Sequence, residues 1–378
     1  MPAWVSAFAG LAALAAAMGI GRFAFTPILP MMQEDFGLSV SAAGWLASAN
    51  YLGYLLGALS AIGTRIQQTA AIRTGLLAIG LTTLAMGLTQ QFLLWAVLRL
   101  VAGIASAWVL VFVSAWALDR LAAMGRSGLS GAVYAGVGTG IVIAGGACLA
   151  VMRLHAPSAD AWLSLGAISL AITVVIWPLV KANPSGHPAP AAKSASPGIW
   201  SGEFRRLVLC YGVFGFGYII PATFLPAMAK QIIPDPALFG WAWPVFGVAA
   251  LASTLLAAQL RHFLSDRTIW IAGHLLMALG VAIPLAAPGL PGIMLAAILV
   301  GGTFMVVTMA GMQEARRVGG AQARALMAAM TAAFAAGQIA GPVFVSLVAP
   351  LAGGYAIALI LAAAFLAGSA LFLRSKHG

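Results

Sequence analysis

Apolar segments long enough to cross a lipid bilayer recur along the whole chain and constrain its fold more than any other feature. A helix needs about 20 apolar residues to cross the roughly 30 Å hydrocarbon core of a membrane. Hydrophobic residues make up 62% of the 378 positions and charged residues only 7%, whereas a soluble domain carries roughly 25% charged residues to meet water. We therefore predict an all-α membrane protein with twelve transmembrane helices, at about residues 4–31, 41–62, 72–89, 92–117, 129–152, 161–180, 203–228, 239–260, 268–286, 291–312, 325–348 and 353–373.

The positive charges predict the direction in which the chain crosses the membrane. A net charge of +11 can indicate nucleic-acid binding, but its distribution here does not. If both termini lie on one side, fifteen of the 19 Lys and Arg residues fall in connections on that side and only Arg153 and Lys230 on the other. Cytoplasmic loops carry such an excess of Lys and Arg. We expect a multi-pass protein of the cell inner membrane with both termini in the cytoplasm and no nucleic-acid partner.

An internal repeat divides the chain into two parts of similar length. Five residues of the first apolar segment recur 196 positions later, and at the same offset Gly44-Trp45 recurs as Gly240-Trp241 and Arg65 as Arg261. An even number of helices per repeat gives parallel repeats. We predict an N-terminal six-helix bundle at 1–180, a cytoplasmic linker rich in Pro, Ser, Gly and Ala at 181–202, and a C-terminal six-helix bundle at 203–378. The five recurring residues are Gly19, Gly21, Leu29, Pro30 and Met32.

Two parallel six-helix repeats joined by a cytoplasmic linker resemble the major facilitator superfamily. Within it, the run from Gly19 to Pro30 is similar to the YbfB/YjiJ-like branch of bacterial transporters. The Arg99-x-x-x-Gly103 pattern also resembles a superfamily motif, as does the run from Gly337 to Pro342. The loop after the second helix departs from the superfamily pattern, because it keeps Arg65 and lacks the usual acid. The resemblance implies a secondary transporter that works as a monomer.

Two arginines lie inside predicted helices, whereas all eight acidic residues fall in loops or at helix ends. An arginine at the bilayer centre costs roughly 2.5–3.5 kcal/mol on insertion scales, so each needs a compensating role. A guanidinium presents a planar fork of donors that suits a carboxylate. We hypothesise that Arg22 binds an anionic substrate and that Tyr218, at the equivalent repeat position, is its partner across the cavity. Arg99 either contacts substrate or bonds to the backbone of a broken helix, and a backbone role stays open for Arg22 too.

Other polar and aromatic residues inside the predicted helices are secondary candidates for substrate contact. Individually, each such residue is more often a packing residue or an interhelical hydrogen-bond partner. His274 could suit proton coupling, but the resemblance places its helix at the periphery, where a structural role is expected. The secondary candidates are Thr26, Asn50, Tyr54, Tyr134, Trp243, Thr303 and Gln338.

The sequence leaves two functions open. The first is a secondary active transporter that moves a small organic anion of the carboxylate type by alternating access, as a symporter or an antiporter. The alternative is an exporter of neutral or amphipathic compounds, in which tryptophans such as Trp241 and Trp243 dominate the cavity. We expect no enzymatic activity and no cofactor, because we find no Ser/His/Asp set, no metal cluster and no phosphate-binding G-x-x-x-x-G-K-[ST] motif. The expected partners are a small-molecule substrate and the lipid bilayer.

Overall fold

The computed structural model describes residues 2–182, 202–232, 242–287, 289–348 and 354–374, and every regular element in these ranges is a helix. The expected linker falls almost entirely outside the described residues. The helices are α1 (Ala3–Leu14), the π-helix η1 (Ala15–Ile20), α2 (Phe25–Phe36), α3 (Val40–Gly63), α4 (Gln68–Met86), α5 (Phe92–Ala123), the 3₁₀-helix η2 (Ser127–Leu129), α6 (Ser130–Arg153), α7 (Ser158–Ile176), α8 (Gly202–Ile232), α10 (Ala242–Leu260), α11 (Asp266–Ala286), α12 (Leu290–Gly319), the 3₁₀-helix η3 (Gly320–Gln322), α13 (Ala323–Val348) and α14 (Gly354–Arg374).

Most of these helices are built to face lipid. Ten stretches of the described chain are long and apolar enough to cross a membrane. One of them, Ala3–Phe36, holds α1, η1 and α2, and another, Pro291–Val345, holds both α12 and α13. Large apolar side chains point outward, among them Leu93 at 75% exposure and Leu347 at 72%. Lipid is the solvent that tolerates this apolar surface while the helices satisfy their own backbone hydrogen bonds.

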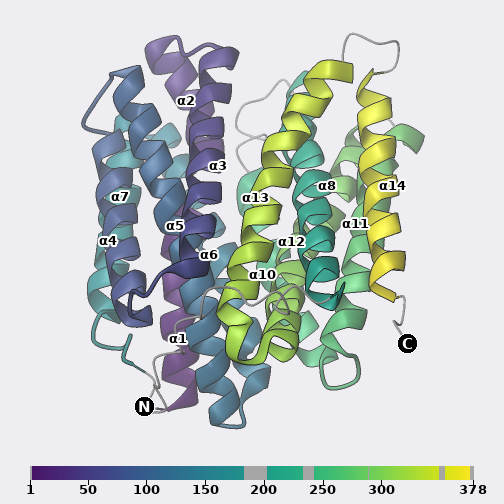
Figure 1. Ribbon diagram of the computed structural model, residues 1–378. Helices are drawn as coiled ribbons and strands as arrows, with labels where there is room; N and C mark the ends of the chain where they lie inside the picture. Colours follow the sequence, from purple (N-terminus) through teal and green to yellow (C-terminus); the bar gives the residue numbers. More distant parts are fainter. Residues whose placement is uncertain (1, 183–201, 233–241, 288, 349–353, 375–378) are drawn as a thin grey trace.

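The helices form two groups that stand side by side (Figure 1). We call α1–α7 the N-terminal group and α8–α14 the C-terminal group. The most extensive contacts between the groups are those of α3 with α13 and of α6 with α10. The start of α1 and the end of α14 lie at the same end of the molecule, which we call the terminal end (Figure 1).

Polar bonds join the two groups at the terminal end. They connect charged side chains of the C-terminal group to side chains or backbone carbonyls of the N-terminal group, so they hold the groups together there. The bonds are Arg316 Nε to Asp119 Oδ1 at 2.8 Å, Arg261 Nη1 to Ser130 Oγ at 2.8 Å and to Ser127 O at 3.0 Å, and Arg324 Nη2 to Thr64 O at 3.2 Å.

The first membrane segment is not one continuous helix. It passes from α1 into the π-helix η1, then through a turn at 21–24 into α2. Gly19 lies so close to α6 that a Cβ atom there would stand 2.3 Å from the Cα of Gly140, and no larger residue fits without a shift. Beyond the turn, Thr26 N–H donates to the carbonyl of Phe23 at 3.2 Å, and Pro27 has no N–H to donate. The carbonyl of Arg22 is therefore left without its usual helical donors.

Candidate functional site

A cavity of about 60 Å³ lies between the two groups, beside the break in the first membrane segment. The turn at 21–24, α2, α3 and α5 line it from the N-terminal group, and α8, α10 and α13 from the C-terminal group. A site that both groups share is where alternating access requires a substrate to bind. The residues of our sequence hypotheses that line this cavity are Arg22, Thr26, Arg99, Tyr218, Trp243 and Gln338.

Arg22 is the central polar residue of the cavity. Its side chain is buried, with 3% of the residue exposed. The guanidinium stacks on the ring of Tyr54, with 3.7 Å from Cζ to the ring centroid, and Nη2 donates a hydrogen bond to Oε1 of Gln338 in the opposite group. The other terminal nitrogen, Nη1, is buried and has no hydrogen-bond partner among the described residues. A charged donor in this state is suited to an acceptor that enters the cavity.

Arg99 lies beside Arg22 but is bonded to the backbone. Its Nη1 approaches the carbonyl oxygen of Gly21 at 3.3 Å and its Nη2 that of Arg22 at 3.4 Å. The guanidinium also lies 4.8 Å from the ring centroid of Phe25, and Asn50 Nδ2 donates to the Arg99 carbonyl at 3.0 Å. These contacts supply donors to the carbonyls at the break in the first segment. The arrangement fits the backbone alternative for Arg99, in which it supports the turn that carries Arg22.

The C-terminal group presents aromatic rings to the cavity. Tyr218 is 2% exposed and stacks on Phe304, with the ring centroids 5.3 Å apart. Trp243 stacks on Phe246 at 5.4 Å, and its Nε1 is buried without a hydrogen-bond partner among the described residues. The indole therefore adds a second donor on the side opposite Arg22. A ligand between these walls meets hydrogen-bond donors at its polar end and rings along its apolar body.

No acidic side chain of the described residues lines this cavity. Among the described acids, Glu314 is buried, at 1% exposure, but it lies in the last turns of α12 and pairs with Arg267 at 2.8 Å and Arg317 at 2.7 Å. Within the described chain, the salt bridges are formed by other arginines, and neither Arg22 nor Arg99 takes part in one. The cavity is consequently positive and rich in donors.

The remaining candidates lie outside the cavity lining. Asn50 and Tyr54 contact the two arginines from α3 but are not among the residues that line the cavity. Tyr134 donates to Ser114 Oγ at 2.9 Å inside the N-terminal group, and Thr303 donates to carbonyls of its own helix, at 2.6 Å for Leu299.

Three aromatic residues of the N-terminal group line the cavity and escaped the sequence analysis: Phe23, Phe25 and Tyr51. Apolar residues in a membrane segment carry no signal that separates cavity walls from lipid-facing positions. Tyr51 was detectable in principle, because it lies next to Asn50 and three positions before Tyr54, within one helical turn of two sequence candidates.

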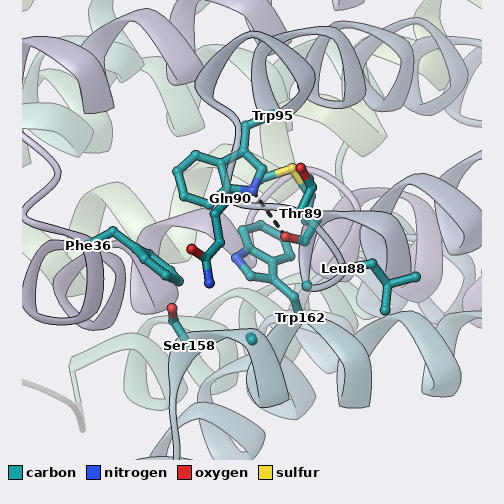
Figure 2. A pocket seen from close by; sticks show the side chains of 10 residues that line it. Phe36, Leu88, Thr89, Gln90, Trp95, Ser158 and Trp162 are labelled. Atoms are coloured by element: carbon teal, nitrogen blue, oxygen red, sulfur yellow. Dashed lines mark hydrogen bonds between the residues drawn. The ribbon is translucent and has the colours of Figure 1, made fainter.

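A second cavity, of about 90 Å³, lies within the N-terminal group alone (Figure 2). Phe36, Trp95, Ser158 and Trp162 surround it, and the indole of Trp95 donates to the carbonyl of Met86 at 3.0 Å. The hydroxyl of Ser158 and the indole nitrogen of Trp162 have no partner within the described chain. The residues that line this cavity all belong to the N-terminal group, so the two groups do not share it, and we do not assign substrate to it.

The helical fold, its lipid-facing surface and the shared cavity are consistent with a polytopic membrane transporter of the major facilitator type. Comparison with known proteins agrees: residues 14–374 match the family described as uncharacterised MFS-type transporter YbfB, and the chain belongs to this family. A relative from Bacillus subtilis (strain 168), described as the uncharacterized MFS-type transporter YceJ, is 25% identical over 286 residues, which are 71% of this chain and 70% of that protein. The resemblance seen in the sequence is thus confirmed.

Proposed function

We propose that the protein is a secondary active transporter that moves a small organic carboxylate across the cell inner membrane by alternating access. The observation that carries this proposal is the buried Nη1 of Arg22, which has no partner among the described residues. It belongs to a cavity that no acidic side chain of the described chain lines. A guanidinium binds a carboxylate through short, charge-assisted hydrogen bonds that are roughly twice as strong as neutral ones. A cationic substrate would meet two arginines and no carboxylate at the same place.

The aromatic walls refine the chemistry of the substrate. The ring of Phe23 lies 6.4 Å from that of Trp243, across the boundary between the two groups. Together with Phe25, Tyr51 and Tyr218 these rings enclose an apolar space next to the donors of Arg22 and Trp243. We therefore propose a monocarboxylate with an apolar or aromatic body. A dicarboxylate would place its second charge against the aromatic rings, with the neutral indole N–H of Trp243 as its donor, which binds an anion more weakly than a guanidinium does.

We further propose twelve membrane crossings arranged as two six-helix repeats. Shifting each helix of the N-terminal group by 196 residues places it on a helix of the C-terminal group: α4 falls on α11, α5 on α12 and α7 on α14. The same shift takes α3 to α10 and α6 to α13, so it exchanges the two main intergroup contacts, α3 with α13 and α6 with α10. Such an exchange is what a two-fold axis along the membrane normal produces. It supports bundles at 1–180 and 203–378, a linker between them, and a monomer as the working unit.

The orientation of the chain follows from its charges. We place the terminal end in the cytoplasm, because the connections there carry most of the Lys and Arg residues. In this orientation the bonds of Arg316, Arg261 and Arg324 close the cytoplasmic side of the boundary between the groups. These bonds must break when the cavity opens to the cytoplasm.

The proposal is tested by thermal unfolding of the purified full chain in detergent with matched ligands. Acetate, butyrate and benzoate are compared with acetamide, butyramide and benzamide, which have similar shapes and no charge. A ligand at 100 times its Kd stabilises the folded state by about 2.7 kcal/mol. We expect carboxylates to raise the melting temperature, benzoate most, and the Arg22→Gln variant to lose this response. Arg205→Gln, at an exposed position of α8, is the matched control and keeps it.

The alternative function, export of neutral or amphipathic compounds, rests on the same aromatic walls. It predicts that benzamide and uncharged amphiphiles raise the melting temperature as much as benzoate does, in Arg22→Gln as in the unmodified chain. That outcome would replace the carboxylate proposal. A positive result with carboxylates leads to uptake measurements in proteoliposomes, with and without a pH gradient, which separate proton symport from anion exchange.

A further inference from the structure

Gln338 forms a hydrogen bond between the two groups at the level of the cavity. It lies in the middle of α13, is 1% exposed, and accepts from Nη2 of Arg22 through its side-chain oxygen. The residues are 316 positions apart in the chain and belong to opposite groups. The bond therefore ties the C-terminal group to the residue that we propose to hold the substrate.

The geometry of the guanidinium makes Gln338 and a carboxylate competitors. A carboxylate binds an arginine most strongly when two parallel N–H groups reach its two oxygens. On Arg22, Nη1 has no partner among the described residues, but Nη2 already donates to Gln338. Each terminal nitrogen carries two N–H groups, so a carboxylate that takes both nitrogens displaces the amide oxygen where it claims the N–H that Gln338 holds. Its negative charge favours this exchange, because the amide oxygen of Gln338 is neutral.

The helix that carries Gln338 is able to respond to such a displacement. Pro342 stands four residues further along α13 and has no N–H, so the carbonyl of Gln338 lacks its ordinary helical donor. Helices bend most readily at such a point. The same helix begins beside Arg324, whose Nη2 donates to the carbonyl of Thr64 at 3.2 Å. Helix α13 thus ties the two groups at two heights, once in the cavity and once at the terminal end.

We propose that Gln338 is an internal competitor of the substrate, and that displacing it is the step that loosens α13 from the N-terminal group. This inference rests on the proposed function, since it takes the substrate to be an anion held by Arg22. Gln338 then acts as a positioning and selectivity residue: it satisfies Arg22 until a ligand arrives that binds arginine better than an amide does. Neutral compounds, which offer no stronger acceptor, fail to release it.

Two substitutions of Gln338 test the competition with opposite expected results. In Gln338→Ala the competitor is gone, so we expect benzoate to bind roughly three- to tenfold more tightly, the factor that one modest net hydrogen bond is worth. In Gln338→Glu a carboxylate is supplied within the chain, so we expect benzoate affinity to fall more than tenfold and the ligand-free melting temperature to rise. Affinities come from calorimetric titration of the full chain with benzoate, or with the panel carboxylate that stabilises the unmodified chain most. Gln313→Glu, at another buried glutamine on α12 with 7% exposure, is the matched control.

The outcomes separate this inference from the function on which it rests. If carboxylates bind the unmodified chain and Gln338→Ala binds them more weakly, Gln338 is a substrate ligand and the competition is wrong. Equal affinity in the unmodified chain and in Gln338→Ala overturns it as well. This measurement decides the matter even if Gln338→Glu fails to fold. If no carboxylate binds the unmodified chain, the proposed function fails first and this inference falls with it.

Discussion

The two groups of helices differ in the height at which they bury charged side chains. At the cavity, the N-terminal group has Arg22 and Arg99 where the C-terminal group has Tyr218 and Leu295 at the positions 196 residues later. The helix that carries the first arginine is broken into α1, η1 and α2, whereas its counterpart α8 runs as one helix from Gly202 to Ile232. The arginine beside the break and the break itself occur together, in one group only. This pairing indicates that Arg99 is present because the turn has carbonyls to satisfy.

At the terminal end the difference is reversed. The C-terminal group holds a network in which Glu203 pairs with Arg206 and Arg267, and Glu314 with Arg267 and Arg317. The corresponding positions of the N-terminal group hold only small or apolar residues. One similar arrangement of helices thus buries charge at two different heights: inside the membrane segments in the N-terminal group, and at the terminal end in the C-terminal group. The apolar counterparts are Ala7, Gly10, Ala71, Leu118 and Leu121.

Arg99→Leu removes the difference between the two groups most directly, because it gives the N-terminal group the leucine that the C-terminal group has at the equivalent position, Leu295. The carbonyls of Gly21 and Arg22 then lose their donors, and a buried unpaired polar group costs about 1–3 kcal/mol. We expect the free energy of unfolding to fall by about 3 kcal/mol and benzoate affinity to fall at least tenfold, measured by chemical denaturation and calorimetric titration. Arg73→Leu is the control, since Arg73 also donates to two carbonyls, those of Trp177 and Val180, at a more exposed place. Unchanged benzoate affinity in Arg99→Leu would show that the turn does not need this support.

Glu314→Gln tests the charged end of the C-terminal group. The Glu314 side chain is 2% exposed and accepts from Arg267 and Arg317. Its loss removes the buried charge that both arginines share and leaves Arg267 with Glu203 alone. We expect about 2 kcal/mol of destabilisation, within the range for hydrogen bonds to charged groups. Asp119→Asn, which breaks the pair with Arg316 at 52% and 34% exposure, should cost below about 1 kcal/mol. Equal effects of the two substitutions would mean that burial does not distinguish the network from a surface pair.

Trp162→Phe tests the second cavity. The residue 196 positions after Trp162, in the C-terminal group, is Ala358. The change removes an indole N–H that has no partner in the described chain and keeps an aromatic ring. We expect the free energy of unfolding to stay the same or rise by up to about 1 kcal/mol, because an unsatisfied buried donor is costly. The melting temperature should then stay the same or rise slightly. Trp95→Phe should lower the melting temperature, since it removes the indole N–H that donates to the carbonyl of Met86. A drop in Trp162→Phe as large as in Trp95→Phe would reveal that Trp162 has a partner after all.

The sequence predicted the membrane helices well and their ends less well. The apolar segments place the helices, because the hydrocarbon core sets both their length and their composition. Their ends were placed too early where polar residues continue a helix beyond the bilayer. Helix α5 runs to Ala123 and α12 to Gly319, whereas the apolar segments end at about 117 and 312. Charged residues such as Arg120 and Arg317 are good helix formers, and hydropathy cannot register them as helical.

The site was predictable where a residue is costly in lipid and unpredictable where it is not. Arg22 stood out because a buried charge needs a reason, and the repeat then pointed to Tyr218. Tyr134 and Thr303 carried a weaker signal, and the structure satisfies their hydroxyls inside their own group or helix. The bond between Arg22 and Gln338 depends on how the two groups are placed against each other. That placement comes from packing over the whole boundary and leaves no mark on either local sequence.

The anchoring of Arg99 to main-chain oxygens has a consequence for how such a transporter changes over evolutionary time. Every amino acid brings a carbonyl, so the acceptors of Arg99 at positions 21 and 22 persist whatever side chains occupy these positions. Residue 22 is therefore free to vary without dismantling the bend that presents it. Under the function proposed above, a descendant of this chain can acquire a new cargo by exchanging position 22 and its opposite, Tyr218, while it inherits the architecture around them unaltered.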